Sequence, residues 1–200
     1  CEYPNYDGIV IINEINYNPA SGFEQGDAEY EFVELYNNSS GYVNLTGWSP
    51  FIPTDEDSSS LPLAALEYEF ANTTNDLLSC VYSFNSINFM TDGSGSDAVL
   101  KSEKGFTLWQ PANESNPQQE GAFNASVYDD STHVNCSWFR GGWFDSQSMA
   151  WEDVEKGNYF DRLPLESGTP SPGASIYVPF ELKPNETKIT YAHSPIKYHA

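Results

Sequence analysis

The sequence has few basic residues: 8 Lys and Arg stand against 29 Asp and Glu, which gives a formal net charge of −21. None of the basic residues occurs in the first 100 positions. A surface this acidic repels phosphate groups, so the composition argues against nucleic acid as a partner. It is typical of a strongly solvated protein that holds cations only loosely.

Long apolar segments are also missing. No run approaches the roughly 20 apolar residues that a membrane-spanning helix needs, so we expect no membrane span. The chain begins with Cys1 rather than Met and shows no signal peptide. We therefore expect a mature, processed product that is secreted and lies outside the cell or at its surface.

Cysteine is scarce, with only Cys1, Cys80 and Cys136. Three such widely spaced residues exclude a zinc site, which needs paired ligands at short spacing. Because Cys80 and Cys136 both lie in strand-like sequence, we expect them to form a disulfide in an oxidising compartment. Cys1 is then left over, either to pair with another chain or to carry a lipid at the first position of a lipoprotein.

The sequence does contain many aromatic residues, 15% of the total, and β-branched residues in short runs broken by Gly, Pro, Asn and Ser. This pattern favours strands over helices. We predict strands near residues 8–17, 29–37, 42–45, 66–71, 78–84, 97–101, 105–109, 122–128 and 134–139. The fold class is therefore predicted to be an all-β antiparallel sandwich with long polar loops, two of them in "PTDEDSSSLP" and "QPANESNPQQEG".

Acceptor sequences for N-linked glycans are unusually frequent. Eight asparagines begin an Asn-x-Ser/Thr pattern: Asn37, Asn38, Asn44, Asn72, Asn113, Asn124, Asn135 and Asn185. The abundance predicts N-linked glycans on a secreted protein. The alternative is a composition rich in Asn and Ser whose patterns stay unused.

Two predicted strands carry a glutamate among large apolar side chains, Glu14 in "IVIINEINY" and Glu34 in "EFVELYN". Each shares strand parity with apolar neighbours and is predicted to face a partly buried layer. A buried carboxylate needs partners. We interpret both as structural carboxylates that accept hydrogen bonds from backbone amides or a tyrosine hydroxyl, with metal ligation and catalysis as alternatives.

The stretch from Asp92 to Glu103, "DGSGSDAVLKSE", partly matches a calcium-binding loop. It has acidic or hydroxyl side chains at several ligand positions, but Asp97 stands where such loops carry glycine. We interpret it as a polar turn, with calcium binding through Asp92, Asp97 and Glu103 as the alternative. No other cofactor is expected.

The runs "IVIINEINYNP" and "EFVELYNNSSGYVNLTGWS", together with the late "GTPSPGAS", resemble the lamin tail domain family. The resemblance covers about residues 8–175 and is carried by residues 13–19, 31–37, 44–48 and 168–173. It implies an immunoglobulin-like β-sandwich and a non-catalytic module, in which Glu14 and Glu34 are structural. The middle of the chain departs from the family pattern by its long polar loops.

The last 25 residues lie beyond this resemblance and contain a strand pattern. Ile176, Val178, Phe180 and Leu182 alternate with polar residues, and three Lys stand against two Glu. Prolines 179, 184 and 195 would restrict such strands to sheet edges. We predict an N-terminal segment (1–7), a sandwich (8–175) and a C-terminal arm (176–200). The arm is either donated to a neighbouring subunit or folded back on its own sandwich.

Two functions follow from these features. The first is a non-catalytic extracellular structural glycoprotein that assembles head to tail into a filament or surface layer, with other copies of itself as partners. The alternative is a monomeric secreted adhesion or carbohydrate-binding module, for which the aromatic cluster "CSWFRGGWF" could stack on sugars. No His, Ser and Asp arrangement has the logic of a catalytic triad, so no catalytic residue is assigned and no enzyme activity is expected.

Overall fold

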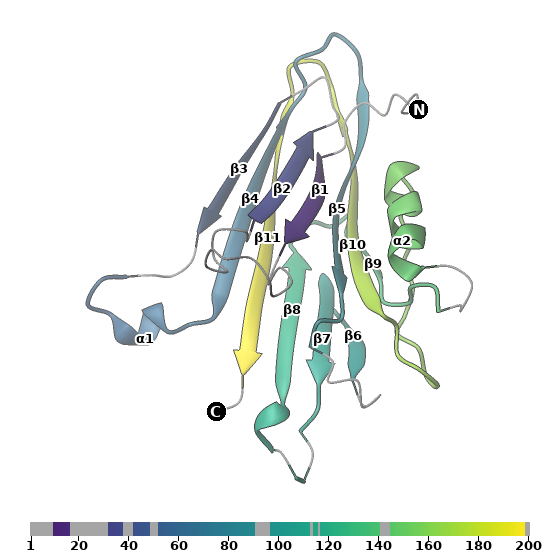
Figure 1. Cartoon of the computed structure of the whole chain (residues 1–200). Coiled ribbons are helices and arrows are strands. Elements are labelled where there is room, and N and C mark those ends of the chain that lie inside the picture. Colours follow the sequence, from purple (N-terminus) through teal and green to yellow (C-terminus); the bar gives the residue numbers. More distant parts are fainter. Residues whose placement is uncertain are drawn as a thin grey trace, which may run out of the picture.

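The computed structural model describes residues 10–16, 32–37, 42–48, 52–90, 97–112, 114–115, 117–140 and 145–198. These residues form a six-stranded sheet, a three-stranded sheet and a separate two-stranded pair, with few helices (Figure 1). The predicted fold class, an all-β antiparallel sandwich, is confirmed. No helix in the described part of the chain has the length and apolar character that crossing a bilayer requires.

The six-stranded sheet has the order β3-β4-β11-β8-β7-β6, and the three-stranded sheet has the order β5-β10-β9. The strands of the larger sheet are β3 (Tyr42–Trp48), β4 (Leu63–Ala71), β11 (Thr187–Tyr198), β8 (Gly121–Val127), β7 (Gly105–Gln110) and β6 (Ala98–Ser102). Those of the smaller sheet are β5 (Leu78–Ile87), β10 (Gly173–Leu182) and β9 (His133–Asn135). β1 (Val10–Asn16) and β2 (Phe32–Asn37) pair with each other, and the helical elements are α1 (Glu56–Ser59), α2 (Ser146–Glu155) and a 3₁₀ turn (Pro117–Gln119).

The hydrophobic core fills the space between the two sheets. Strand β8 shows how alternation builds it: Phe123, Ala125 and Val127 are buried, and the residues between them are only half-buried. Phe106 and Leu108 of the neighbouring β7 are fully buried. Burial of each large apolar side chain contributes roughly 1.5–3 kcal/mol, so the period-two pattern that predicts these strands also accounts for the packing of the sheets.

The predicted C-terminal arm is part of this chain's own sandwich. Residues 173–182 pair with β5 in register from Gly173↔Ile87 to Leu182↔Leu78, and residues 175–177 also pair with β9. Ile176, Val178 and Leu182 are buried in the core, and Phe180 packs against it. In this chain the four residues are therefore folded back into their own sheet, as in the second of the two predictions for the arm. The boundary drawn at residue 175 falls inside β10.

Strand β11 lies inside the larger sheet rather than at an edge. It pairs with β4 from Thr187↔Ala71 to Pro195↔Leu63 and with β8 on its other side. The pairing with β8 stops after His193 and resumes at Ile196. Proline has no N–H to donate, so Pro195 is tolerated in an interior strand because it coincides with this gap in the ladder.

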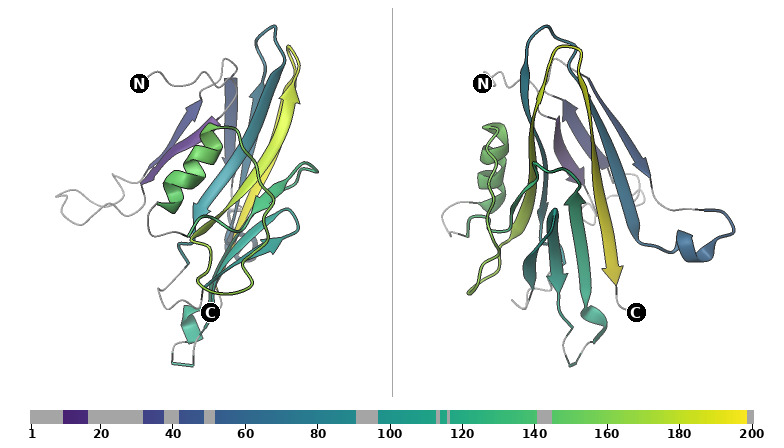
Figure 2. Two further views of the ribbon diagram at one scale, coloured as in Figure 1. Left: turned by 90° about the vertical axis from the view of Figure 1, so that its right-hand side faces the viewer. Right: turned by 180° about the vertical axis from the view of Figure 1, so that it is seen from behind.

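Helix α2 was not predicted and covers the outer side of the three-stranded sheet (Figure 2). It begins where the Asp145 carboxylate accepts hydrogen bonds from the backbone N–H groups of Gln147 and Ser148, which is ordinary N-cap chemistry. Val154 of the helix packs with Tyr177 of β10. Strand β10 is thus covered on both faces, which explains why its pattern is buried at six consecutive positions from 173 to 178.

Replacing Ile176 with Ala tests whether β10 belongs to its own core. The change removes buried methyl and methylene groups from a side chain with 0% exposure. We expect it to lower the free energy of unfolding by about 2–5 kcal/mol, measured by urea denaturation. The matched control is Ile189→Ala, the same substitution at a side chain that is 45% exposed, for which a change below about 0.5 kcal/mol is expected. Equal effects in the two variants would contradict the assignment.

Candidate functional site

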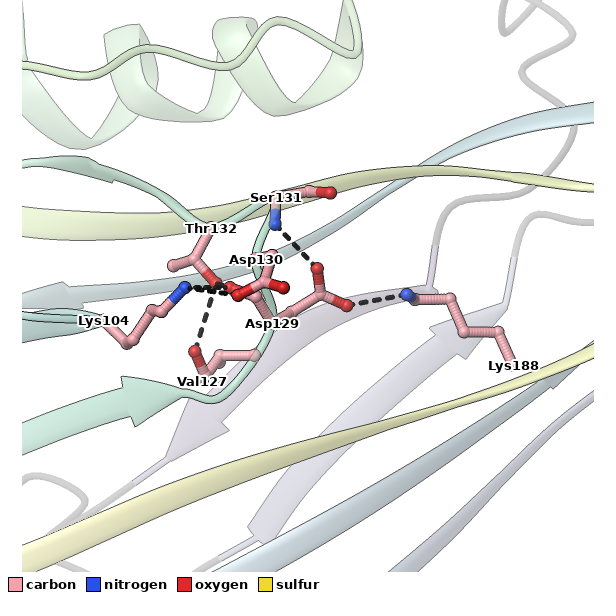
Figure 3. Close-up of polar contacts among 7 residues, drawn as sticks. All are labelled: Lys104, Val127, Asp129, Asp130, Ser131, Thr132 and Lys188. Carbon is pink, nitrogen blue, oxygen red and sulfur yellow. Dashed lines mark hydrogen bonds and ion pairs between the residues drawn. The ribbon is translucent and has the colours of Figure 1, made fainter.

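A cluster of charged side chains lies where the chain leaves β8 in one sheet and continues to β9 in the other (Figure 3). Lys188 Nζ, from β11, donates a hydrogen bond to Asp129 Oδ2 at 2.7 Å. Lys104 Nζ, from the β6–β7 turn, donates to the Asp129 carbonyl oxygen at 2.9 Å and to Asp130 Oδ1 at 3.2 Å. We call these four residues the crossing cluster.

Hydrogen bonds within the segment fix the shape of this crossing. The Ser131 backbone N–H donates to Asp129 Oδ1 at 2.8 Å. The Thr132 hydroxyl donates to the carbonyl oxygens of Asp129 at 2.7 Å and Val127 at 3.1 Å. Short polar side chains thereby replace the strand partners that the backbone loses when it changes sheets.

The electrostatics of the crossing cluster indicate a structural role. Partial burial raises the pKa of Asp129, but hydrogen bonds from Lys188 and Ser131 and the charge of Lys188 outweigh it, so the pKa is lowered overall. Lys188 also lies 5.4 Å from the centre of the Phe180 ring in the opposite sheet. A carboxylate that stays ionised and paired holds the two sheets together and is unsuited to donating a proton.

A second candidate surface is the side of the six-stranded sheet that faces away from the three-stranded sheet, which we call the outer face. Tyr68 and Phe70 of β4 and Thr190 and Ala192 of β11 are buried on the inner side. The residues that alternate with them therefore point outward. The pairing places Thr46, Glu67 and Tyr191 in one row across β3, β4 and β11.

Aromatic rings are exposed on the outer face. Tyr191 is 46% exposed and Tyr128, just after β8, is 72% exposed. The Tyr128 ring contacts the His193 ring edge to face, with 5.4 Å between ring centres. Exposed aromatic rings of this kind offer an apolar surface with a polar tip, which suits ligand contact.

Two carboxylates accompany these rings. Glu67 and Glu69 are half-buried, and two residues of one strand separate their Cα atoms by about 6.8 Å. The Asn44 side-chain amide donates to Glu69 Oε2 at 3.4 Å. This surface was not predicted from the sequence. The alternation of glutamate with apolar residues in "LEYEF" indicates that Glu67 and Glu69 share one face of a strand. It does not indicate that Tyr191 and Asn44 lie in the neighbouring strands.

The predicted disulfide between Cys80 and Cys136 is wrong. Both cysteines are free and buried. Cys80 lies opposite Phe180 of β10, whereas Cys136 follows Asn135, which lies opposite Ser175 on the other side of β10. The two thiols are therefore separated by a strand and by about 20 Å along it, far beyond the reach of a disulfide. Burial raises the pKa of the Cys136 thiol to about 11 and also raises that of Cys80, as for inert core thiols.

The structure does not bring the proposed calcium ligands together. Strand β6 runs between Asp97 and Glu103, so their Cα atoms are about 20 Å apart and cannot share an ion. Asp97 instead accepts a hydrogen bond from the Asn88 amide at 3.1 Å, and Asp92 lies outside the described residues. Among the residues described, no group of three or more His, Cys, Asp or Glu side chains could hold a metal ion.

Two of the asparagines predicted to carry glycans are buried and form hydrogen bonds within the fold. Asn72 is 1% exposed, and its Nδ2 donates to the carbonyl oxygens of Asp76 and Leu182 at 2.8 and 2.9 Å. Its Oδ1 accepts a hydrogen bond from the Thr74 backbone N–H. Asn135 is 2% exposed, and its Oδ1 accepts from the Ser137 N–H. In both cases the Asn-x-Ser/Thr spacing serves an Asx turn, so a glycan has no room there.

The other predicted glycosylation sites differ in access. Asn44 and Asn185 are exposed, whereas Asn124 is half-buried and its Nδ2 donates to Thr107 Oγ1 at 2.9 Å and to the Phe106 carbonyl oxygen at 3.0 Å. Asn38 and Asn113 lie outside the described residues, and for Asn37 only the backbone is described. Glycosylation at the exposed positions stays a prediction.

The two glutamates predicted to be structural are brought together by the pairing of β1 with β2. The Cα atoms of Glu14 and Glu34 are direct partners, next to a register shift between Ile12 and Glu14. Their side chains lie outside the described part of the structure, so the hydrogen bonds predicted for them remain predictions. The alternation along each strand predicted which face each glutamate shares with its apolar neighbours. Only the pairing of β1 with β2 shows that the two glutamates lie opposite each other.

The aromatic cluster considered for sugar stacking is divided between core and surface. Trp138 is buried, and its Nε1 donates to Ser175 Oγ at 2.8 Å. Phe139 is exposed, and residues 141–144 lie outside the described part of the chain. Trp138 is therefore a core residue, and the exposed rings of the outer face are a better surface for a ligand.

Asp129→Asn tests the crossing cluster through pH. Because the folded-state pKa of Asp129 is lowered, its stabilising contribution is present above the unfolded value of about 3.8 and is lost as the pH falls through the folded value. We expect the variant to be roughly 1–2 kcal/mol less stable than the native chain at pH 7, with the gap closing towards pH 3. Asp130→Asn is the control, since its carboxylate is fully exposed and an exposed ion pair contributes little. A gap that does not depend on pH would contradict the role of the charge.

Glycan mapping tests whether the exposed asparagines carry glycans and the buried ones do not. After expression in a host that attaches N-linked glycans, peptide mass spectrometry is expected to find sugar on Asn185 and none on Asn72 or Asn135, because the fold buries the last two. Occupancy of Asn72 in folded, soluble protein would contradict the hydrogen bonds described for its amide.

Comparison with known families gives a match that covers most of the chain. The family model described as "beta-glucosidase 2, glycosyl-hydrolase family 116 N-term" matches residues 27–192. This range contains every strand from β2 to β10 and the first half of β11, so it includes residues of both sheets of the sandwich. No match to a curated protein was found.

This match overturns the resemblance to lamin tail domains. The residues that carried that resemblance lie in β1, β2 and β3 and in the approach to β10, where Gly168 has a positive φ of 82° and a Cβ on Gly173 would lie 2.4 Å from the Ser86 carbonyl oxygen. Local backbone geometry thus accounts for Gly168 and Gly173. The domain also continues beyond residue 175, where the resemblance ended, through the rest of β10 and through β11. The chain belongs to the N-terminal domains of glycosyl-hydrolase family 116.

Proposed function

We propose that the protein is a glycoside hydrolase that cleaves β-glucosidic bonds, and that this chain forms the β-sandwich at its N-terminal side. The family match over residues 27–192 is the observation that carries the proposal, because it spans both sheets rather than a short motif. The substrate class follows from the description of the family as β-glucosidase 2.

The family corrects the function predicted from the sequence. A non-catalytic structural protein that assembles into a filament is wrong, and so is the expectation that the protein is no enzyme. The prediction of assembly depended on a surplus strand, and β10 is bonded to β5 within the same chain. Secretion and N-linked glycans were predicted from separate features and remain predictions.

Glycoside hydrolysis needs one carboxylic acid to protonate the leaving group and a second carboxylate as base or nucleophile. A proton donor of this kind has a raised pKa. Asp55, Asp129 and Asp145 instead have lowered pKa values, the first and last because they accept hydrogen bonds from Ser58 and Ser148 at helix N-termini. These three carboxylates serve the fold. Glu67 and Glu69 of β4 face outward, and Glu67 is the direct partner of the exposed Tyr191, where it suits contact with a sugar.

The proposal is tested by assaying the full-length protein with the 4-nitrophenyl glycosides of β-glucose and α-glucose. We expect nitrophenol release from the β anomer and little or none from the α anomer. The control is the same preparation after heat denaturation. Failure to cleave the β anomer across pH 4–8 would overturn the proposed activity.

A further inference from the structure

We propose that the outer face of the six-stranded sheet binds a short neutral gluco-oligosaccharide, through Tyr128, Tyr191, His193, Glu67, Glu69 and Asn44. The identity of the sugar rests on the proposed function. The binding surface itself rests on the arrangement of these side chains on β3, β4 and β11 and just after β8.

The first observation is the exposure of aromatic rings in adjacent strands. Tyr191 and Tyr128 keep 46% and 72% of their surface accessible, although burial of such rings is strongly favourable. The contact of Tyr128 with His193 holds two of the rings at a defined angle. The apolar face of a pyranose, which presents C–H bonds, packs well against the electron-rich face of an aromatic ring.

The second observation is the position of hydrogen-bond acceptors beside the rings. Glu67 is the direct partner of Tyr191 across the β4–β11 ladder, and Glu69 follows two residues later. An ionised carboxylate only accepts hydrogen bonds, and two vicinal sugar hydroxyls can donate to its two oxygens. The amide of Asn44 donates to Glu69 and fixes one of its oxygens. Rings that stack and carboxylates that accept thus meet on one surface.

The third observation is charge. Lys197 pairs with Ala122 at the far end of β11, about 20 Å along the strand from Tyr191. Among the outward positions whose side chains the structure describes, the six strands carry no Lys or Arg. Together with the net charge of −21, this disfavours phosphate, sulfate and acidic sugars as ligands. A neutral polyol needs no counter-charge and fits a surface of hydroxyls, carboxylates and rings.

The length of the surface favours more than one sugar unit. The six residues extend from the end of β8 across β11 and β4 to β3. Three spacings between neighbouring strands amount to about 14 Å. A surface of this length, with rings at one side and acceptors at the other, suits an extended oligosaccharide rather than a single monosaccharide held in a pocket.

The test uses the full 200-residue chain expressed without glycosylation, because a glycan on Asn44 would cover part of the surface. Binding of cellotetraose is measured by isothermal titration calorimetry, and its location by chemical-shift changes of ¹⁵N-labelled backbone amides. We expect saturable binding, with shifts in β4 and β11. Tyr191→Ala is expected to weaken binding roughly tenfold, as for the loss of one stacked ring.

Two further variants make the outcome decisive. Glu67→Gln keeps the size of the side chain but removes its charge, and it is expected to weaken binding severalfold with an unchanged melting temperature. Trp151→Ala is the matched control, since Trp151 is also an exposed aromatic residue but lies on α2 at the other side of the molecule. It should bind cellotetraose as the native chain does.

No saturable binding of cellotetraose by folded protein would overturn the inference, and so would equal weakening by Tyr191→Ala and Trp151→Ala. These results are separate from those for the proposed function. A full-length protein that cleaves β-glucosides while the chain binds no cellotetraose would leave the hydrolase proposal standing, and binding without any cleavage would do the reverse.

Discussion

The hydrogen bonding of β10 to β5 is the interaction on which the rest of the sandwich depends. It runs without interruption from Gly173 to Leu182, and β9 adds to the other edge of β10. One side of the strand faces the core through Ile176 and Val178, and the other lies under α2 through Tyr177. Because both faces, the whole edge towards β5 and part of the edge towards β9 are occupied, β10 cannot leave without exposing the core and the inner side of the helix.

Asn72 holds the far end of this strand in place. Its side chain donates to the Leu182 carbonyl oxygen, and its backbone bonds to Glu186 and Asn185 in the β10–β11 turn. Asn185 adopts a positive φ of 61° at that turn, a conformation that asparagine tolerates better than most residues. The Asn-x-Thr pattern at Asn72 therefore forms an Asx turn that is bonded to the end of β10 and to the β10–β11 turn. Asparagine side chains both form Asx turns and accept glycans, so the pattern alone does not distinguish the two.

Alternate residues of β11 point to opposite faces of the six-stranded sheet. Lys188 points inward to Asp129 and ties the β8–β9 crossing to the sheet, whereas Tyr191 points outward beside Glu67. One interior strand therefore anchors the crossing cluster and carries an exposed ring of the outer face. A side chain on a rigid interior strand is held in position better than one on a loop.

The sequence alone determined the strands and the fold class, because the alternation of apolar and polar residues is a property of each strand by itself and does not depend on which strands are neighbours. It predicted the strands from β1 to β9 and the apolar stripe of β10. Tertiary structure decided which strands are neighbours, and with them the separation of Cys80 from Cys136, the burial of Asn72 and the meeting of Tyr191 with Glu67. Helix α2 was missed because only Ala150 and Val154 of its ten residues are buried, too narrow an apolar stripe to give a helical period. Pairing depends on contacts between residues far apart in the chain, and periodicity carries no information about which strand a given side chain will meet.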